Sequence, residues 1–205
     1  MEYSSETEQK IIKAATEVFL QKGKEGARMQ EIAGRAGINK ALLHYYFRSK
    51  EKLYNQVFTK EVSQVFEDFF ESIPLEKRME DFLHTFVFNY IDHILKHPQV
   101  VRFMLWELES GAENLKEIFR GIYTSRQERT PLTIIQRIET AIQDGEIRPL
   151  DSLQLLISII GVCVYAFVAK PLLEALFPGV NVTDPAFAEK RKKEVFNLIW
   201  NGIKS

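Results

Sequence analysis

Cysteine is almost absent from this chain of 205 residues, whose single cysteine, Cys163, lies within an apolar stretch. One thiol excludes both an internal disulfide framework and a cysteine-based zinc site within one chain. Such sparse cysteine suits a reducing compartment. The N-terminus, MEYSSETEQK, is polar and acidic and lacks the apolar segment of a signal peptide. We therefore expect a cytoplasmic protein.

Long hydrophobic runs and helix breakers are also scarce. The longest apolar stretch, residues 153–169, is interrupted by Gln154, Ser158 and Gly161, and it is shorter than the roughly 20 residues that span a bilayer. A buried helix is the better interpretation, and no membrane partner is expected. Only seven prolines and ten glycines occur, so few residues interrupt long periodic segments.

The chain has little net charge, but its charges are unevenly distributed. The formal net charge is −1, yet residues 1–60 contain eleven Lys and Arg against seven Asp and Glu. Such asymmetry is typical of a nucleic-acid or membrane contact by the basic part, although a small excess also arises by chance. Apolar residues make up 45% of the chain, which is enough to form a packed core.

Apolar residues recur at intervals of three and four through almost the whole chain, which predicts helices and leaves no competing strand pattern. A first helix ends near Gly23 and Gly26. Pro131 should kink or briefly interrupt one long helix. The further helices are predicted at residues 29–36, 40–46, 50–70, 75–97, 98–109, 113–144, 151–176 and 184–204. The fold class is therefore all-α.

The segment MQEIAGRAGINKALLHYY, residues 29–46, reads as two short helices joined by a tight turn. Alanines at 33 and 36 allow the helices to approach closely, and Gly37 permits a left-handed backbone angle at the turn. This is the arrangement of a helix-turn-helix, whose second helix enters the major groove of DNA. The pattern alone is weak evidence, because any short helical hairpin can mimic it.

The residues that follow the turn strengthen the DNA interpretation. Between Asn39 and Lys50 there are three basic residues, a histidine and two tyrosines, but no acid. Tyrosine and lysine suit phosphate contacts, and histidine suits phosphates or base edges. Lys50 directly follows the expected helix cap Ser49, and a helix N-terminus attracts phosphate. A helix that only packs would carry outer charges of both signs.

These residues resemble the DNA-binding domain of the tetracycline-repressor (TetR-type) family of bacterial transcriptional regulators. The resemblance covers about residues 8–58 and rests on EIAGRAGI, on Tyr45-Tyr46-Phe47 and on the start of the next helix, Ser49-Lys50-Glu51-Lys52-Leu53. It implies an N-terminal three-helix DNA-binding domain, residues 1–55. A larger helical bundle for ligand binding and dimerisation, residues 56–205, would follow.

The resemblance also implies roles for individual residues. Arg28 and Gln30 would meet phosphate or a base edge. Lys40, Ala41, Leu42 and His44 would face the groove, and Tyr45, Tyr46 and Lys50 would fix the register on the backbone. The sequence departs from the family pattern at Ala27, where threonine is the usual cap, and at Leu42 and His44. Leu42 has two open interpretations, contact with a thymine methyl group or burial in the core.

The function that follows is sequence-specific transcriptional regulation, by a homodimeric repressor that binds a palindromic operator in double-stranded DNA. The resemblance places the dimer interface on the helices at 151–176 and 184–204. An unknown small-molecule effector, apolar or aromatic, would release the DNA by favouring a wider separation of the two DNA-reading units. The candidate interface residues are Leu156, Ile160, Val164, Phe167, Phe196 and Ile199. The candidate pocket residues are Phe103, Trp106, Tyr123 and Tyr165.

Two alternatives stay open at this point. One is a DNA-binding protein that has no small-molecule effector. The other is a metal-dependent helical enzyme, because His93 and His97 lie four residues apart with Asp92 adjacent. No third ligand follows at a familiar spacing, and neither HExxH nor a nucleophile motif occurs. We therefore expect no enzyme activity, no metal and no cofactor.

Overall fold

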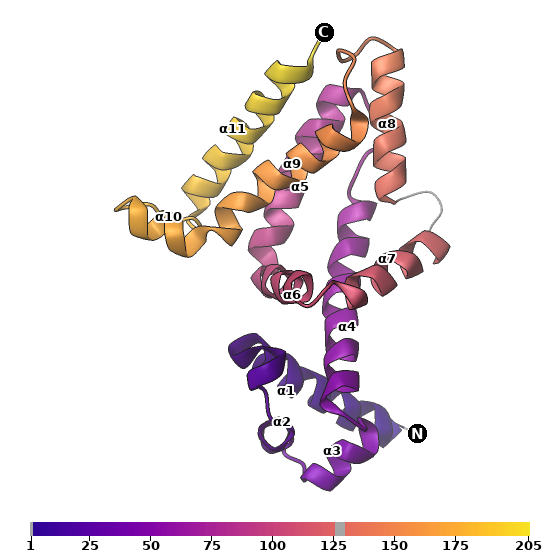
Figure 1. The fold of residues 1–205 in the computed structure, drawn as a ribbon, viewed down its shortest axis with the longest axis vertical. Helices are drawn as coiled ribbons and strands as arrows, with labels where there is room; N and C mark the ends of the chain where they lie inside the picture. Colours follow the sequence, from indigo (N-terminus) through magenta and orange to yellow (C-terminus); the bar gives the residue numbers. More distant parts are fainter. Residues whose placement is uncertain (1, 126–129) are drawn as a thin grey trace. The chain divides into compact units, whose positions relative to one another are not determined.

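The computed structural model describes residues 2–125 and 130–205, and within them every regular element is an α-helix (Figure 1). An isolated bridge between Ile147 and Lys204 is the sole β-type pairing in this part of the chain. The all-α prediction is confirmed. The helices are α1 (Glu2–Gly26), α2 (Met29–Arg35), α3 (Lys40–Tyr46), α4 (Lys50–Glu71), α5 (Met79–Lys96), α6 (Pro98–Glu109), α7 (Glu113–Ser125), α8 (Pro131–Gln143), α9 (Ser152–Val168), α10 (Lys170–Leu176) and α11 (Pro185–Ile203).

Two prolines decide where the longest predicted helices divide. The segment at 113–144 is interrupted, as predicted, and α8 begins at Pro131, where Thr133 Oγ1 accepts a hydrogen bond from the Thr130 amide at 3.0 Å. The single helix predicted over 151–176 is wrong, because α9 and α10 meet at Ala169 with a bend of 63°. Pro171 lacks an amide proton, and its ring clashes with the preceding turn, so a straight helix cannot pass through it.

The chain forms two compact units. Unit 1 contains residues 1–64 and 99–120, and unit 2 contains residues 65–98 and 121–205. Helices α4 and α7 therefore contribute residues to both units. The units are not simple halves of the sequence, because α6 and the start of α7 pack with the N-terminal helices.

Aromatic side chains form the centre of unit 1. The ring of Tyr54 on α4 lies edge-on to Phe19 of α1, with 5.1 Å between the ring centroids. Phe103 of α6 lies edge-on to both Tyr54 and Phe58, at 6.1 and 6.0 Å. All four side chains are buried, so α1, α4 and α6 share one core. Burying an aromatic side chain contributes about 1.5–3 kcal/mol, which makes this cluster a main source of stability in the unit.

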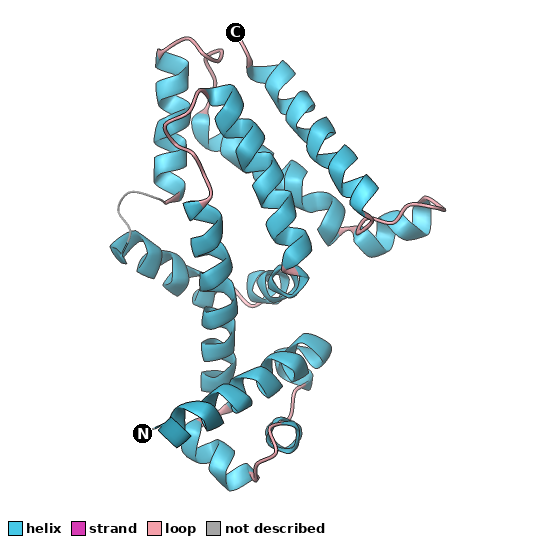
Figure 2. Ribbon diagram, turned by 180° about the vertical axis from the view of Figure 1, so that it is seen from behind, coloured by secondary structure: helices cyan, strands magenta, loops and turns pink. Residues whose placement is uncertain are grey.

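In unit 2, α5 packs against α9 and α11, and α8 packs against α9 (Figure 2). A polar cluster joins α8 to the start of α5. Arg137 on α8 donates to Glu146 at 2.9 Å and to the Lys77 carbonyl at 2.7 Å, and the Met79 amide donates to Glu146 at 2.6 Å. Glu146 thus satisfies one of the free amide groups at the N-terminus of α5.

No single helix in residues 2–125 and 130–205 has both the length and the apolar character needed to cross a membrane. The bent pair α9 and α10 meets those criteria of length and composition only when its two helices are taken together. Five residues of α9 are buried within the protein, as in the core helix of a helical bundle.

Candidate nucleic-acid interface

Helices α2 and α3 are joined by a tight turn whose geometry is set by two residues. Gly37 has φ of 69°, a left-handed conformation that glycine adopts without a steric cost. The Ile38 amide donates back to the Ala33 carbonyl at 3.0 Å, which closes the turn. The side chain of Asn39 then accepts a hydrogen bond from the Leu42 amide at 2.8 Å and caps α3. The predicted helix-turn-helix is confirmed.

The buried side of this motif fixes which side of α3 faces outward. Ile32 and Ala33 of α2 and Leu43 of α3 have no exposed surface, and Phe47, which ends α3, is also buried. Because α3 turns by about 100° per residue, the positions on either side of Leu43 point away from this core. The tertiary packing therefore presents one face of α3 outward.

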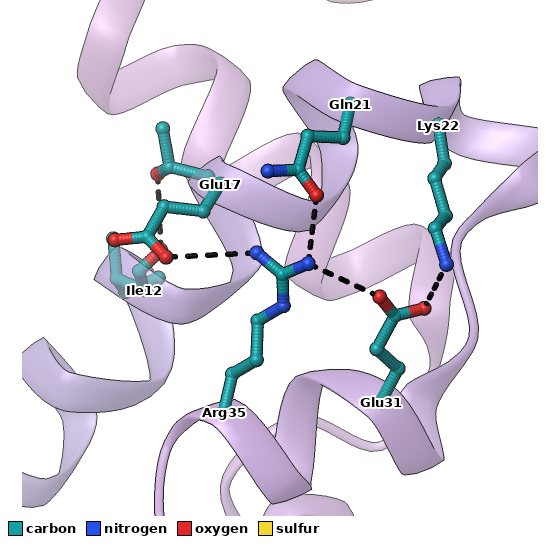
Figure 3. A network of polar contacts seen from close by, with 7 residues as sticks. Ile12, Glu17, Gln21, Lys22, Glu31 and Arg35 are labelled. Atoms are coloured by element: carbon teal, nitrogen blue, oxygen red, sulfur yellow. Dashed lines mark hydrogen bonds and ion pairs between the residues drawn. The ribbon is translucent and has the colours of Figure 1, made fainter.

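A polar network holds α2 against α1 (Figure 3). The Arg35 guanidinium donates to Gln21 at 2.7 Å and lies 3.4 Å from Glu31, which also pairs with Lys22 at 2.7 Å. The hydrogen bond from Lys22 is the largest cause of the lowered pKa of Glu31. Exposed pairs of this kind add little stability individually. Arg35 and Glu31 are thus paired with side chains of α1 and with each other. Neither charge is part of the outward face of α3.

The outward face brings together most of the residues predicted to contact DNA. Lys40, Ala41 and His44 are exposed on α3, and Arg28 and Gln30 are exposed at the start of α2. Leu42 retains 37% exposure and Tyr45 78%. Tyr46 is half-buried and lies edge-on to Tyr45, with 5.6 Å between ring centroids. The face combines hydrogen-bond donors, aromatic rings and positive charge, the side chains that bind phosphates and base edges.

The start of α4 lies within the same motif, directly after α3. Ser49 caps this helix by accepting from the Lys52 amide at 3.2 Å, as predicted. Lys50 is half-buried, and its ammonium group donates to the Glu25 carbonyl at 3.2 Å. This bond satisfies a carbonyl at the end of α1 and fixes the lysine in place. Arg48, which was not among the predicted contacts, is exposed between α3 and α4. Its position in the stretch without acidic residues between Asn39 and Lys50 could have identified it as a DNA contact from the sequence.

The threonine cap that Ala27 replaces is not compensated by another side chain. Arg28 occupies the N-cap position of α2, and its side chain makes no capping hydrogen bond. Ala27 itself is buried, with 3% exposure. The position therefore contributes apolar packing in this chain, and the Glu31 amide in the first turn of α2 donates to the Arg28 carbonyl at 3.0 Å.

The predicted pocket residues are distributed over both units of the chain. Phe103 is completely buried in the core of unit 1, and Trp106 packs edge-on against it with 6.0 Å between the ring centroids and lies beside Gly23. Tyr165 belongs to unit 2 and is 56% exposed. The side chain of Tyr123 lies outside the described residues. Sequence alone could not separate core aromatic residues from pocket aromatic residues.

The predicted interface residues keep different amounts of exposed surface within the single chain. Leu156 is buried within the chain, and Ile160, Val164, Phe167, Phe196 and Ile199 are half-buried. The large exposed apolar residues of α9 and α11 are instead Leu153, Ile157, Tyr165, Val168 and Leu198. Leu153 and Ile157 are four residues apart and so share one face of α9. Because α9 carries no charged residue, its periodicity could not identify this face.

The histidines proposed as metal ligands make other contacts. His93 Nδ1 lies 2.8 Å from the Asn89 carbonyl, and the ring centroids of His93 and His97 are 6.3 Å apart. Among residues 2–125 and 130–205, no three or more His, Cys, Asp or Glu side chains are placed so that they could share a metal ion.

Comparisons with known proteins agree with this geometry. Residues 11–57 match the family model described as bacterial regulatory proteins of the tetR family. Residues 80–199 match the model of the tetracyclin repressor-like C-terminal domain. The HTH-type transcriptional regulator RutR of Escherichia coli O157:H7 is 28% identical over 95% of this chain and 89% of its own length. The HTH-type transcriptional repressor SCO4008 of Streptomyces coelicolor is 25% identical over 94% of this chain and 95% of its own.

Solved structures share the fold. A TetR family transcription regulator from Marinobacter aquaeolei VT8 superposes with a TM-score of 0.68 at 19% identity, covering 100% of both chains. The TetR family regulator PfmR from Thermus thermophilus gives a TM-score of 0.63 at 18% identity, covering 93% of this chain and 97% of its own. With both family models matched, more than half of the sequence is accounted for. The chain belongs to the TetR family of DNA-binding transcriptional regulators.

Proposed function

We propose that this protein is a cytoplasmic, homodimeric repressor that binds a palindromic operator and is released from it by a small apolar or aromatic effector. The observation that carries the proposal is the outward face of α3, which is exposed and free of acid between Asn39 and Lys50. Phosphate binding supplies much of the affinity for DNA, and base contacts supply the specificity. This face offers both kinds of group.

In this proposal the contacts divide into two classes. Lys40, Ala41, Leu42 and His44 face the major groove, and Arg28 and Gln30 approach from α2. Tyr45, Tyr46 and Lys50 bind the phosphate backbone and set the register, together with the exposed Arg48. The anchoring of Lys50 by the Glu25 carbonyl supports a backbone role, because a lysine held in place loses less conformational entropy on binding.

Dimerisation is supported by large exposed apolar residues on α9 and α11. Leu153 and Ile157 are 50% and 54% exposed, and Leu198 is 67% exposed. Large exposed apolar groups gathered on one face are typical of a protein–protein interface. In a two-fold symmetric dimer the same face occurs on both subunits, and the two α3 helices would read the two halves of a palindrome.

An effector site is supported in unit 2 by a cluster of aromatic rings. Phe69 at the end of α4 lies edge-on to Phe86 and to Tyr90 of α5, at 5.2 and 5.3 Å. Burial raises the pKa of Tyr90, and it raises the pKa of the nearby Cys163 thiol to about 12. An uncharged ligand suits surroundings of this kind, because burying an unpaired charge against apolar rings is costly. The effector would therefore be an uncharged, apolar or aromatic molecule that shifts the population of DNA-binding conformers.

Selection of binding sites from random duplex DNA tests the proposal. We expect the purified protein to enrich a palindrome, with affinity that falls steeply as salt rises. Uncharged aromatic compounds would then be screened for release of that duplex, with their carboxylate analogues as matched controls. Failure to enrich any sequence would contradict the proposed operator contacts. A palindrome that no compound releases would instead favour a DNA-binding protein without a small-molecule effector.

A further inference from the structure

Two consecutive leucines of α3 differ sharply in their surroundings. Leu43 is completely buried, whereas Leu42 keeps 37% of its surface exposed. The backbone amide of Leu42 is already satisfied by the Asn39 side chain at 2.8 Å, so the position is fixed by the helix cap. The backbone of Leu42 is therefore held by the cap, and part of its apolar side chain is left in water.

The surroundings of Leu42 indicate what covers it. Tyr45, three residues further along α3 and so on the same side of the helix as Leu42, is 78% exposed. Lys40 and His44 are exposed elsewhere on this short helix, and Arg48 is exposed just beyond it. No acidic residue lies between Asn39 and Lys50. This positive, acid-free surface complements a nucleic acid far better than the apolar patch of another protein. The DNA major groove offers one apolar feature on its base edges, the C5 methyl group of thymine.

We propose that Leu42 determines specificity by packing against the C5 methyl group of a thymine in each half of the operator. This inference rests on the proposed contacts between α3 and DNA. It excludes the alternative in which Leu42 belongs to the core, because Leu43 and Phe47 already provide the core contacts of this helix. Polar groups on α3 would read hydrogen-bonding edges, and Leu42 would read only the methyl group.

Deoxyuridine provides a direct test, because it differs from thymidine only by the absence of this methyl group. In the palindrome selected from random DNA, each thymine would be replaced by deoxyuridine symmetrically in both half-sites, one position at a time. At one position we expect affinity to fall about fourfold per half-site, the equivalent of about one buried methyl group. Deoxyuridine at the other positions should have a smaller effect.

The variant Leu42→Ala assigns the effect to this side chain. It should bind thymine and deoxyuridine duplexes equally at the sensitive position, whereas Leu42→Met, which keeps apolar contact, should still prefer thymine. Leu132→Ala, at another exposed leucine, is the matched control and should preserve the wild-type preference. Circular dichroism would verify that each variant is folded.

The outcomes separate this inference from the proposed function. If the protein enriches no sequence, the proposed DNA contacts fail and the inference fails with them. If a palindrome is recovered but deoxyuridine has no effect, or if Leu42→Ala shows the same methyl preference as the wild type, the role of Leu42 is refuted and the operator contacts stand. The role of Leu42 is established if Leu42→Ala loses the preference for thymine over deoxyuridine while Leu42→Met and Leu132→Ala keep it.

Discussion

The phenol of Tyr54 lies beside the carboxylate of Glu107, a side chain that is only 3% exposed. Glu107 accepts a hydrogen bond from the Asn114 side chain at 2.9 Å. Tyr54 lies on α4, Glu107 on α6 and Asn114 on α7, so one buried carboxylate faces side chains of two other helices of unit 1. Burial, together with the neighbouring Glu107, raises the pKa of Tyr54, so the phenol stays protonated and can donate a hydrogen bond to the carboxylate.

Replacing Tyr54 by phenylalanine tests the importance of this bond. The variant keeps the ring contacts with Phe19 and Phe103 but removes a donor from a buried carboxylate, so we expect a loss of about 1–3 kcal/mol in the free energy of unfolding. Urea denaturation would measure it. Tyr45→Phe, at a ring that is 78% exposed, is the control and should leave the stability nearly unchanged. Equal stability of the two variants would show that the bond is unimportant.

Lys50→Ala separates backbone binding from base reading. Because Lys50 is expected to contact phosphate, its loss should weaken binding to all duplexes by a similar factor and reduce the salt slope by about one unit. Titrations of selected and random duplexes at several salt concentrations would measure both effects. Lys116→Ala, which removes an exposed lysine paired with Glu113, is the control and should leave the slope unchanged. A change confined to one sequence would assign Lys50 to base contact instead.

Ile157→Glu should disrupt the proposed dimer. Residue 157 lies on the exposed apolar face of α9, and a carboxylate there would be desolvated and unpaired in a symmetric interface. We expect monomers by light scattering and weak operator binding, with the helical content retained. Leu132→Glu is a closely matched control, since Leu132 on α8 has the same 54% exposure as Ile157. If the Ile157 variant stays dimeric, the interface lies elsewhere.

The Glu146 cluster should make part of the stability depend on acid pH. Burial alone would raise the pKa of Glu146, but hydrogen bonds from the Met79 amide and Arg137, with the charge of Arg137, lower it below 4.5. A carboxyl group whose pKa is lower in the folded state stabilises the fold above its unfolded pKa, and this contribution is lost as pH falls through the folded value.

Unfolding of Glu146→Gln and wild-type protein should therefore be compared between neutral pH and about pH 3. The difference in stability between the two proteins should be greatest near neutrality and should shrink as the pH falls below 4.5. Glu117→Gln, at an exposed glutamate, should follow the wild type throughout. A constant difference across this range would show that the charge of Glu146 does not stabilise the fold.

Local sequence signals determined the helices and the DNA-reading motif. Gly37 set the turn, Ser49 supplied the cap of α4, and Pro131 marked the start of α8. These features depend on backbone conformations and hydrogen bonds between residues only a few positions apart, so the sequence specifies them directly. Pro171 was a local signal of the same kind for the break between α9 and α10. The apolar residues on both sides of it nevertheless favoured the prediction of one continuous helix.

Long-range packing decided the remaining features. The exposed side of α9 could not be predicted, because a helix without charged residues has no polar face to orient it. The sequence also could not show that Phe103 packs against Tyr54 and that Trp106 lies beside Gly23. Lys50 meets Glu25 only because α1 and α4 lie together. The sequence determined which residues form helices, whereas tertiary structure determined which side of each helix is buried, because that depends on neighbours distant in the chain.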